Sequence, residues 1–389
     1  MRAALAQLLC AVAGLGLGLL LPRIPTGTSV ASSRVTETLV AVGFGVLGLA
    51  SIIFTLLFLV AQWAFSSLSP RLNLFRDDPI VWRSFGLAIG VWVFSVTAAL
   101  AIGNDTKVSV IVPIVEVVAA LATLALIRTL LVKAFASIQL APALSAIAAQ
   151  GRATIDDLYR HPRTSDTRWA APQLPPLART VTWPHRQAIL QQLDLRRLCA
   201  AAGTAVIVFR ARAGDTLQEG APVASLHGAD VADAAVLGAL VTGQERTFGQ
   251  DPMFAFRLLA DIGLRALSPA VNDPATAVQV LDTIESLLLA LAPRDPDVAE
   301  VADDTGTIRI VLALPSWNDY LQIALDDLIE SSSQSPMVLL RARAMLSSLR
   351  NAAPPQRQPS IAWRLHHVEE LAASNFPVLW RNTAHQDAG

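Results

Sequence analysis

The sequence contains little charge, few lysines and only two cysteines, and each shortage excludes a class of protein. Charged residues make up 16% of the 389 residues, whereas a soluble domain carries about a quarter, so we expect part of the chain in lipid. Only Lys107 and Lys133 are lysines and the formal net charge is −1, which excludes the basic surface of a nucleic-acid binder. Cys10 and Cys199 are too far apart to form a disulfide framework or a metal-binding motif.

Residue patterns typical of enzymes are also missing. The sequence has no HExxH motif, no phosphate-binding glycine loop, no dinucleotide fingerprint and no Gly-x-Ser-x-Gly elbow. The histidines are scattered over segments that resemble linker, loop and tail, at positions 161, 185, 227, 366, 367 and 385. We therefore expect no catalytic residue, no metal site and no cofactor, and we predict that the protein is not an enzyme.

The first third of the sequence does contain long apolar runs, at about residues 3–21, 39–65, 85–102 and 108–131. A helix needs about 20 apolar residues to cross a hydrocarbon core of about 30 Å, and all of these runs qualify. Arginine and lysine are more frequent in the segments that share a side with the N-terminus, which predicts cytoplasmic termini. We expect a multi-pass protein of the bacterial inner membrane, surrounded by the lipid bilayer. Close packing between its helices is predicted by glycines spaced by four residues, at positions 14, 18, 86 and 90.

We expect four segments along the chain. Residues 1–135 form a four-helix transmembrane domain, and residues 136–185 form a helical extension, capped at Gly151, and a linker. Residues 186–228 form a helix and a small β insert, because turn signals separate short apolar stretches there. Residues 229–389 form a mainly helical domain that ends in a polar tail. The predicted fold class is a membrane α-helical protein with four transmembrane helices and a cytoplasmic, mainly helical α+β domain with a small β insert.

Glu116 lies near the middle of the fourth apolar run, where an ionisable side chain is costly and indicates a functional site. Pro113 precedes it and can kink the helix. We interpret Glu116 as an ion or proton site that lines a pathway; the alternative is a protonated carboxyl that bonds a neighbouring helix or lies at a shallower depth. Gln62 is the second candidate intramembrane residue, and we expect it, like Ser51 and Thr55, to form hydrogen bonds between helices.

Arginines and acids alternate in the cytoplasmic stretch ERTFGQDPMFAFRLLADIGLR. Arg257, Asp261 and Arg265 are spaced by four, so Asp261 can pair with both arginines on one helical face. Asp251 precedes a proline and is expected to cap a helix. An alternative interpretation is that Arg246, Arg257 and Arg265 together bind an anion. We favour ion pairing with the neighbouring aspartates, because it occupies these arginines.

The residues that follow, ALSPAVNDPATA, combine two prolines with an Asn-Asp pair. Asn272 suits a left-handed turn conformation. Asp273 can accept hydrogen bonds from the first amides of a helix that begins at Pro274. We interpret this stretch as a structural corner between two helices rather than a catalytic loop.

These motifs and the four-span layout resemble a bacterial membrane-protein family of unknown activity, catalogued as domain of unknown function 2254. The match starts at Gln62 and includes a Ser-Pro-Arg-Leu string and a downstream arginine, namely Ser69, Pro70, Arg71, Leu72 and Arg76. It continues through the Glu-Arg-Thr, Gln-Asp-Pro and Asn-Asp-Pro-x-Thr-Ala strings and through residues 317–346. The resemblance implies a multi-pass membrane topology and brings no defined activity.

The connections on the outer side are short, so a bulky function must lie in the membrane or in the cytoplasm. Our leading hypothesis is a homo-oligomeric channel or transport-related protein for ions or small solutes, whose cytoplasmic domain controls assembly or gating. The second hypothesis is a non-transporting scaffold or signalling protein whose cytoplasmic domain recruits a protein partner. A membrane enzyme ranks last.

Overall fold

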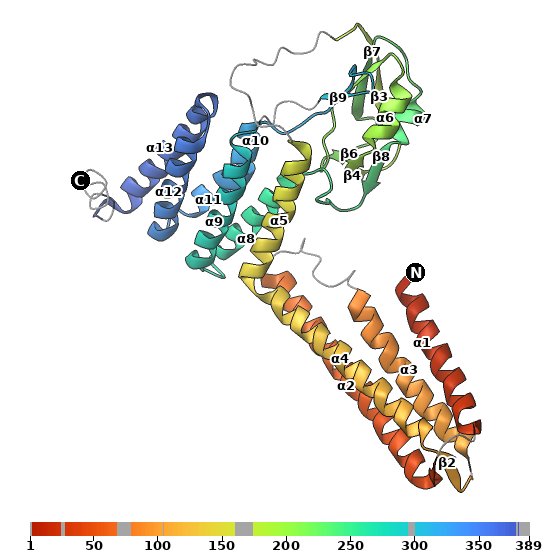
Figure 1. Ribbon diagram of the computed structural model, residues 1–389. Helices are drawn as coiled ribbons and strands as arrows, with labels where there is room; N and C mark the ends of the chain where they lie inside the picture. Colours follow the sequence, from red (N-terminus) through yellow and green to blue (C-terminus); the bar gives the residue numbers. More distant parts are fainter. Residues whose placement is uncertain are drawn as a thin grey trace. The chain divides into compact units, whose positions relative to one another are not determined.

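The computed structural model describes residues 2–24, 28–67, 79–103, 105–159, 174–294, 300–378 and 380. The chain forms two compact units, Met1–Pro142 and Ala143–Gly389. The first unit is a helical bundle, and the second contains helices and two β-sheets (Figure 1). Several apolar helices followed by a helical and β part agree with the predicted fold class at this level.

The described part of the first unit contains the long helices α1 (Arg2–Leu20), α2 (Ser32–Ser67), α3 (Pro79–Ile102) and α4 (Ile111–Ile138). Helix α3 is central, because it contacts each of the other three, and α2 also contacts α4. A short turn of 3-10 helix, η1 (Leu21–Arg23), follows α1. The antiparallel strands β1 (Ser29–Ala31) and β2 (Lys107–Ser109) pair at one end of the bundle and tie the α1–α2 connection to the α3–α4 connection.

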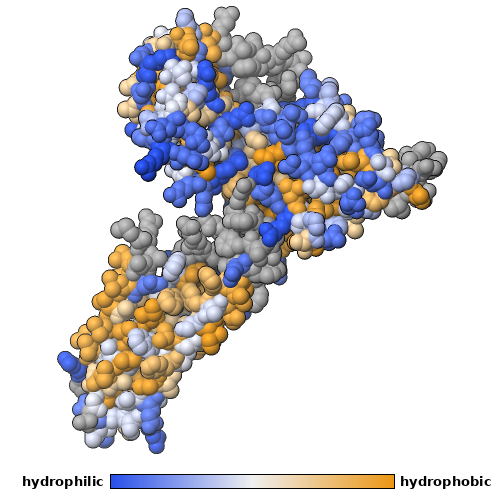
Figure 2. Space-filling model, turned by 180° about the vertical axis from the view of Figure 1, so that it is seen from behind, coloured by the Kyte–Doolittle hydropathy of each residue, from blue (hydrophilic) through white to orange (hydrophobic). Residues whose placement is uncertain are grey.

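The surface of this bundle is apolar, as expected for helices in lipid. Figure 2 shows a mainly hydrophobic surface over the bundle, and the side chains of Leu8, Phe58 and Val118 are among the most exposed. Within the described residues, five helices are long and apolar enough to cross a membrane. Four of them coincide with the runs expected from the sequence, and the fifth is α9 (Pro274–Leu291) of the second unit. The length and composition of the helices alone therefore do not confirm the expected number of four membrane spans.

The helical part of the second unit is arranged around α9. Helix α9 packs against α8 and α12, and α12 packs in turn against α13. The other helical elements lie before α8, between α9 and α12, or between α12 and α13. In chain order, the helical elements are α5 (Leu140–Leu158), α8 (Met253–Ala266), α9, α10 (Trp317–Leu321), the π-helical turn η2 (Gln322–Asp326), α11 (Asp327–Ser331), α12 (Pro336–Ala352), η3 (Pro355–Arg357) and α13 (Gln358–Asn375).

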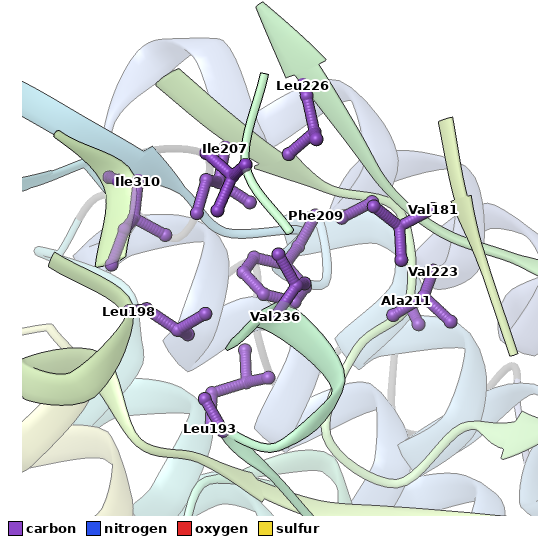
Figure 3. Packing of buried hydrophobic residues seen from close by; sticks show 14 of the residues in the cluster. Val181, Leu193, Leu198, Ile207, Phe209, Ala211, Val223, Leu226, Val236 and Ile310 are labelled. Atoms are coloured by element: carbon purple, nitrogen blue, oxygen red, sulfur yellow. The ribbon is translucent and has the colours of Figure 1, made fainter. Parts of the chain in front are cut away.

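The β part of the second unit has a five-stranded sheet in the order β3-β7-β5-β10-β9 and a three-stranded sheet in the order β6-β4-β8. Strand β10 lies parallel to β5, with Ile310 opposite Ile207, and both side chains are in the apolar core with Phe209 and Leu226 (Figure 3). The elements are β3 (Leu177–Thr182), β4 (Ala188–Leu193), α6 (Leu195–Ala202), β5 (Val206–Phe209), β6 (Thr216–Leu217), β7 (Pro222–His227), α7 (Asp233–Leu237), β8 (Leu240–Gly243), β9 (Glu300–Ala302) and β10 (Ile308–Val311).

Two local predictions are wrong. The helix expected at the start of 186–228 is instead strand β4 followed by α6, because Leu190 and Leu193 are buried in the sheet core and the Asp194 carboxylate caps α6. The linker expected at 161–185 contains β3 in its described part, whereas residues 160–173 lie outside the described residues.

Gly151 does not cap a helix, because it lies inside α5. A Cβ atom at this position would lie 2.6 Å from Cβ of Ala255 on α8. That is much closer than two such atoms can approach. Glycine therefore serves the close approach of α5 to α8, and the helix continues to Leu158.

Candidate functional site

Glu116 lies in α4, five residues after the helix begins at Ile111. Its side chain is fully buried, although carboxyl groups are rarely buried without a partner. Oγ of Ser95, on α3, lies 2.7 Å from Oε1 of Glu116 and 2.8 Å from the carbonyl oxygen of Val91. The other carboxyl oxygen, Oε2, is buried and has no hydrogen-bond partner within the described residues. One carboxyl oxygen is thus held by a hydroxyl, and the other has no hydrogen-bond partner among the described residues.

A glycine on α2 completes this polar layer. A Cβ atom at Gly43 would lie 2.5 Å from Cβ and 2.6 Å from Oγ of Ser95. Helix α2 therefore presses directly on the serine that contacts Glu116. We call Gly43, Ser95 and Glu116 the polar layer, because α2, α3 and α4 contribute one residue each.

The polar layer lies between two apolar clusters of the bundle. The cluster nearer the β1–β2 pair consists of Val35, Leu39, Phe94, Ala98, Ile102, Val108 and Val112. The cluster on the other side consists of Val46, Ala50, Ile53, Ala88, Val91, Ala120 and Ile127. In α2 and α4 the polar-layer residue separates members of one cluster from members of the other, whereas in α3 Ser95 follows Phe94 of the cluster nearer the β1–β2 pair. The carboxyl group of Glu116 is therefore shielded from water along the helix axes in both directions.

The depth of Glu116 differs from the sequence-based expectation. At a rise of about 1.5 Å per residue, Glu116 lies about 7.5 Å along the axis from the start of α4 rather than near the middle of the span. Pro113 falls in the first turn of α4, where a missing amide hydrogen is tolerated. The sequence suggested that Pro113 could kink α4, but a proline in the first turn removes no hydrogen bond of the helix and gives no reason to expect a kink.

The other candidate residues of the membrane region have different surroundings. The hydroxyls of Ser51 and Thr55 donate to carbonyl oxygens of their own helix, at Leu47 and Ser51, and both side chains are exposed. The predicted hydrogen bonds between helices are therefore wrong for these two residues within this chain. Gln62 is exposed on α2. The remaining members of the motif lie outside the described residues, namely Ser69, Pro70, Arg71 and Arg76.

In the second unit, Asp251 forms a buried ion pair. Its side chain is 2% exposed, and Oδ2 lies 2.7 Å from Nη2 of Arg246. Oδ1 accepts a hydrogen bond from the amide of Phe254, so the carboxylate also caps the start of α8, as predicted. Gly214, at φ 93°, covers the pair so closely that a Cβ atom there would lie 2.3 Å from Oδ2. The loop of the β part is thereby fixed against the first turn of α8.

The buried carboxyl of Asp251 gives the second unit a pH dependence. Burial raises the pKa of Asp251 from 3.8 to about 6, against the opposing charge of Arg246. Between about pH 4 and pH 6 the folded protein then binds more protons than the unfolded chain. We expect the free energy of unfolding to fall by roughly 3 kcal/mol as the pH rises through this window, and to level off above it.

Hydrogen exchange of the α8 amides in the full-length protein measures this dependence. Asp251→Asn should flatten the pH profile, because asparagine does not titrate. Asp304→Asn changes an exposed aspartate and is the matched control. A profile that keeps its slope in Asp251→Asn would contradict the assignment.

The charge ladder on α8 is partly formed. Nε of Arg257 lies 2.9 Å from Oδ1 of Asp261. Nε of Arg265 is buried and has no hydrogen-bond partner in the part of the chain that the structure describes. Arg246 and Arg257 are thus occupied by aspartates, which supports ion pairing over anion binding at these two positions.

The corner between α8 and α9 has the predicted geometry. Asn272 has a φ of 47° and is the only non-glycine residue with a positive φ among the described residues. The Asp273 carboxylate accepts hydrogen bonds from the amide of Thr276 at 3.1 Å and from its hydroxyl at 2.6 Å, and Pro274 begins α9. The Asp273 amide donates to the carbonyl of Ala266. Asn272 therefore adopts the backbone conformation that the turn requires, and Asp273 forms the hydrogen bonds that cap α9.

Substitutions at Asn272 test the left-handed conformation. Asn272→Ala is expected to destabilise the α8–α9 corner by about 1 kcal/mol. Alanine is less stable than asparagine in the left-handed conformation, because its Cβ atom lies too close to a backbone carbonyl oxygen and its side chain forms no local hydrogen bond. Asn272→Gly is expected to leave stability nearly unchanged, because glycine adopts positive φ freely. Hydrogen exchange at the start of α9 would report both values. Equal losses in the two variants would show that the side chain, and not the backbone conformation, matters here.

Comparisons with known proteins agree with this architecture. A family model described as predicted membrane protein (DUF2254) matches residues 2–348. An uncharacterized protein of Mycobacterium bovis and one of Mycobacterium tuberculosis are each 28% identical over 394 residues. These alignments cover 93% of this chain and 74% of each relative. No solved structure matches the chain.

Proposed function

Because the chain belongs to the DUF2254 family of predicted membrane proteins, we propose that it is an inner-membrane transport protein for ions or small solutes. In this proposal α1, α2, α3 and α4 cross the bilayer, both termini are cytoplasmic, and the second unit controls gating or assembly. Helix α9 is assigned to the cytoplasmic unit, because its Asp282 and Glu285 form ion pairs with Arg341 of α12. Such charges are costly within lipid.

The burial of Glu116 carries the proposal. Ionisable groups within membrane spans are rare and commonly mark ion pathways or proton relays. Glu116 has one carboxyl oxygen without a partner in the described chain, which a purely structural hydrogen bond would not require. A packing role alone would be served equally well by an apolar residue of similar size. Retaining a carboxyl group there supports a site that binds and releases an ion.

A free face of α2 supports assembly of several copies of the chain. Helix α2 has 36 residues and is thus about 54 Å long, so it extends well past a single hydrocarbon core. Its exposed residues at alternating three- and four-residue spacing form one stripe, comprising Ala41, Gly45, Gly48, Ile52, Thr55, Leu59 and Gln62. No atom of the described residues lies within 4 Å of a Cβ built at Gly45 or Gly48. Small residues at this spacing allow a second helix to approach closely. Native mass spectrometry in detergent would detect the oligomer, and a monomer would contradict this part of the proposal.

Ion flux into proteoliposomes tests the transport function. We expect the wild-type protein to carry flux and Glu116→Gln to lose most of it, because glutamine keeps the shape of the site and cannot ionise. Glu37→Gln, an identical change at an exposed position of α2, is the matched control and should retain flux. Wild-type protein without flux, or equal flux in wild type and Glu116→Gln, would contradict the proposal.

One observation favours the second candidate function, a scaffold that recruits a soluble protein. The indole of Trp363 on α13 is 62% exposed and stacks against His367. Exposed tryptophans are enriched at the centres of protein interfaces. In this alternative, a soluble partner co-purifies with the full-length protein and is lost in Trp363→Ser. Failure to recover any partner with wild-type protein would leave transport as the better proposal.

A further inference from the structure

The hydroxyl of Ser95 lies within hydrogen-bond distance of two acceptor oxygens but has only one hydrogen atom to donate. It carries one hydrogen atom, and its oxygen lies 2.8 Å from the Val91 carbonyl oxygen and 2.7 Å from Oε1 of Glu116. The carbonyl oxygen can only accept. If Glu116 were ionised, both neighbours of the hydroxyl would need the same hydrogen. A proton on Oε1 resolves the conflict, because Glu116 then donates to Ser95 and Ser95 donates to Val91.

The surroundings of the carboxyl group also favour the neutral form. An ionised carboxylate in an apolar interior needs a cation or several donors. Oε2 of Glu116 has neither within the described residues. The other charged residues of α2, α3 and α4 are Arg34, Glu37, Arg83, Arg128 and Lys133. Of the cations, Arg128 and Lys133 lie on the same helix as Glu116, and the nearer one, Arg128, is twelve residues away, which is about 18 Å along the axis. Arg23 of η1 and Lys107 of β2, on elements that adjoin these helices, are exposed.

The polar layer offers too few ligands for a metal cation. Hard cations take about six oxygen ligands in proteins. The oxygen atoms placed together here are those of the Glu116 carboxyl, the Ser95 hydroxyl and the Val91 carbonyl. Gly43 presses on Ser95 from α2, and apolar clusters close the layer on both sides. A proton needs neither additional ligands nor additional volume.

We propose that Glu116 is a proton-binding site, protonated while α2, α3 and α4 are packed in this arrangement, and that the proton is the ion that the protein moves. The second half of this inference rests on the proposed transport function. On release, the proton passes from Oε1 to water as the layer opens, and the Ser95 hydroxyl turns from the Val91 carbonyl to the carboxylate. The bond between Ser95 and Glu116 is thus kept with its direction reversed, the bond from Ser95 to the Val91 carbonyl is lost, and the opening of the helices is linked to proton release.

Infrared difference spectroscopy of the full-length protein at neutral pH tests the protonation directly. We expect a carbonyl stretching band of a protonated carboxyl group that is absent in Glu116→Gln and retained in Glu37→Gln. Should Glu116→Gln fail to fold, Ser95→Ala keeps the carboxyl group and should shift the band, because the hydrogen bond to the hydroxyl is lost. Identical spectra for wild type and every one of these variants would overturn the inference.

A second pair of variants tests the role of packing. Gly43→Ala forces α2 away from Ser95, so we expect the band to weaken or shift as water enters the layer. Gly16→Ala is the matched control, because a Cβ there meets nothing within 4 Å. A band that is the same in both variants would contradict the link between packing and protonation.

Flux measurements separate the two proposals. Proteoliposomes are assayed with a pH-sensitive dye for protons and with a radioactive tracer for sodium or rubidium. Glu116-dependent proton movement supports both proposals. Glu116-dependent movement of sodium or rubidium without protons would overturn the inference and leave the transport function standing. A protonated Glu116 without any flux would overturn the transport function and leave the protonation standing.

Discussion

Replacing Arg357 with methionine is expected to lower the free energy of unfolding of the second unit by about 3–5 kcal/mol. The Arg357 side chain is 5% exposed, and its guanidinium donates to the carbonyl oxygens of Leu291, Ala292 and Arg294. The carbonyls of Leu291 and Ala292 lie at the C-terminal end of α9, where helical carbonyls lack amide partners within the helix, and Arg294 follows in the next turn. Methionine fills the volume and leaves the carbonyls of Ala292 and Arg294 without this donor, at about 1–3 kcal/mol each, whereas the Leu291 carbonyl also accepts from the Arg294 amide.

The arginine has further effects that methionine cannot replace. Its guanidinium carbon lies 5.0 Å from the ring centroid of Trp317, a geometry that attracts a cation to the aromatic face. Its positive charge also interacts favourably with the negative, C-terminal end of the α9 dipole. These effects act in the same direction as the hydrogen bonds, so the expected loss is large for a single substitution.

Hydrogen exchange at the C-terminal end of α9, in the full-length protein in detergent, provides the measurement. Arg350→Met is the control, since Arg350 is exposed on α12. Faster exchange in Arg357→Met than in Arg350→Met is the expected result. Equal protection in the two variants would mean that the α9 carbonyls find other donors, and that the guanidinium of Arg357 does not stabilise the C-terminal end of the helix.

Elements with strong local signals could be predicted from the sequence. The corner between α8 and α9 is an example, because Asn272, Asp273 and Pro274 each restrict their own backbone or cap an adjacent amide. The four long helices of the first unit were predicted for a similar reason, since each is one continuous apolar run. In both cases the information lies within one segment, and no distant residue is needed to interpret it.

The sheets could not be predicted in the same way. Strand β10 pairs with β5 in parallel, although about a hundred residues separate them in sequence. Strand β4 contains leucine and glutamine, which are also good helix formers, and only its pairing with β6 and β8 selects the extended conformation. Long-range pairing therefore overrides the local preference of residues 188–193.

The polar contacts of the candidate site show the same limit. The sequence identifies Glu116 as unusual, yet Ser95 and Gly43 carry no signal of their own, because only helix packing brings them to the carboxyl group. Acidic residues of the second unit give a further case: Asp326 pairs with the buried guanidinium of Arg364, which is 38 residues away in sequence. Asp282 of α9 likewise pairs with a distant residue, Arg341 of α12.

Replacing Gly14 with leucine is expected to detach α1 from α3, with a loss of about 3 kcal/mol in the packing of the bundle. A Cβ atom at Gly14 would lie 2.3 Å from the carbonyl oxygen of Gly90. The obstacle is backbone, which cannot rotate away as a side chain can. Gly90 is equally constrained, since its Cβ would lie 2.9 Å from the carbonyl oxygen of Cys10. Within the described residues helix α1 contacts chiefly α3, so its attachment to the bundle depends on this contact.

A disulfide between native Cys10 and an introduced Gly86→Cys reports this contact. Sγ of Cys10 lies 3.6 Å from a Cβ built at Gly86, so oxidation should cross-link α1 to α3 in the Gly86→Cys background. Adding Gly14→Leu should abolish the cross-link. Adding Gly16→Leu should not, because position 16 faces open space and leucine favours both helix and lipid.

The result also bears on assembly. If Gly14→Leu loses the cross-link while Gly16→Leu keeps it, the glycines at positions 14 and 90 serve a contact within one chain and cannot also form an interface between copies. In the proposed oligomer, subunit contacts then use another face, and we propose the exposed stripe of α2 for this role. If both variants keep the cross-link, α1 tolerates a larger separation than this packing allows, and the spaced glycines could be involved in contacts between copies instead.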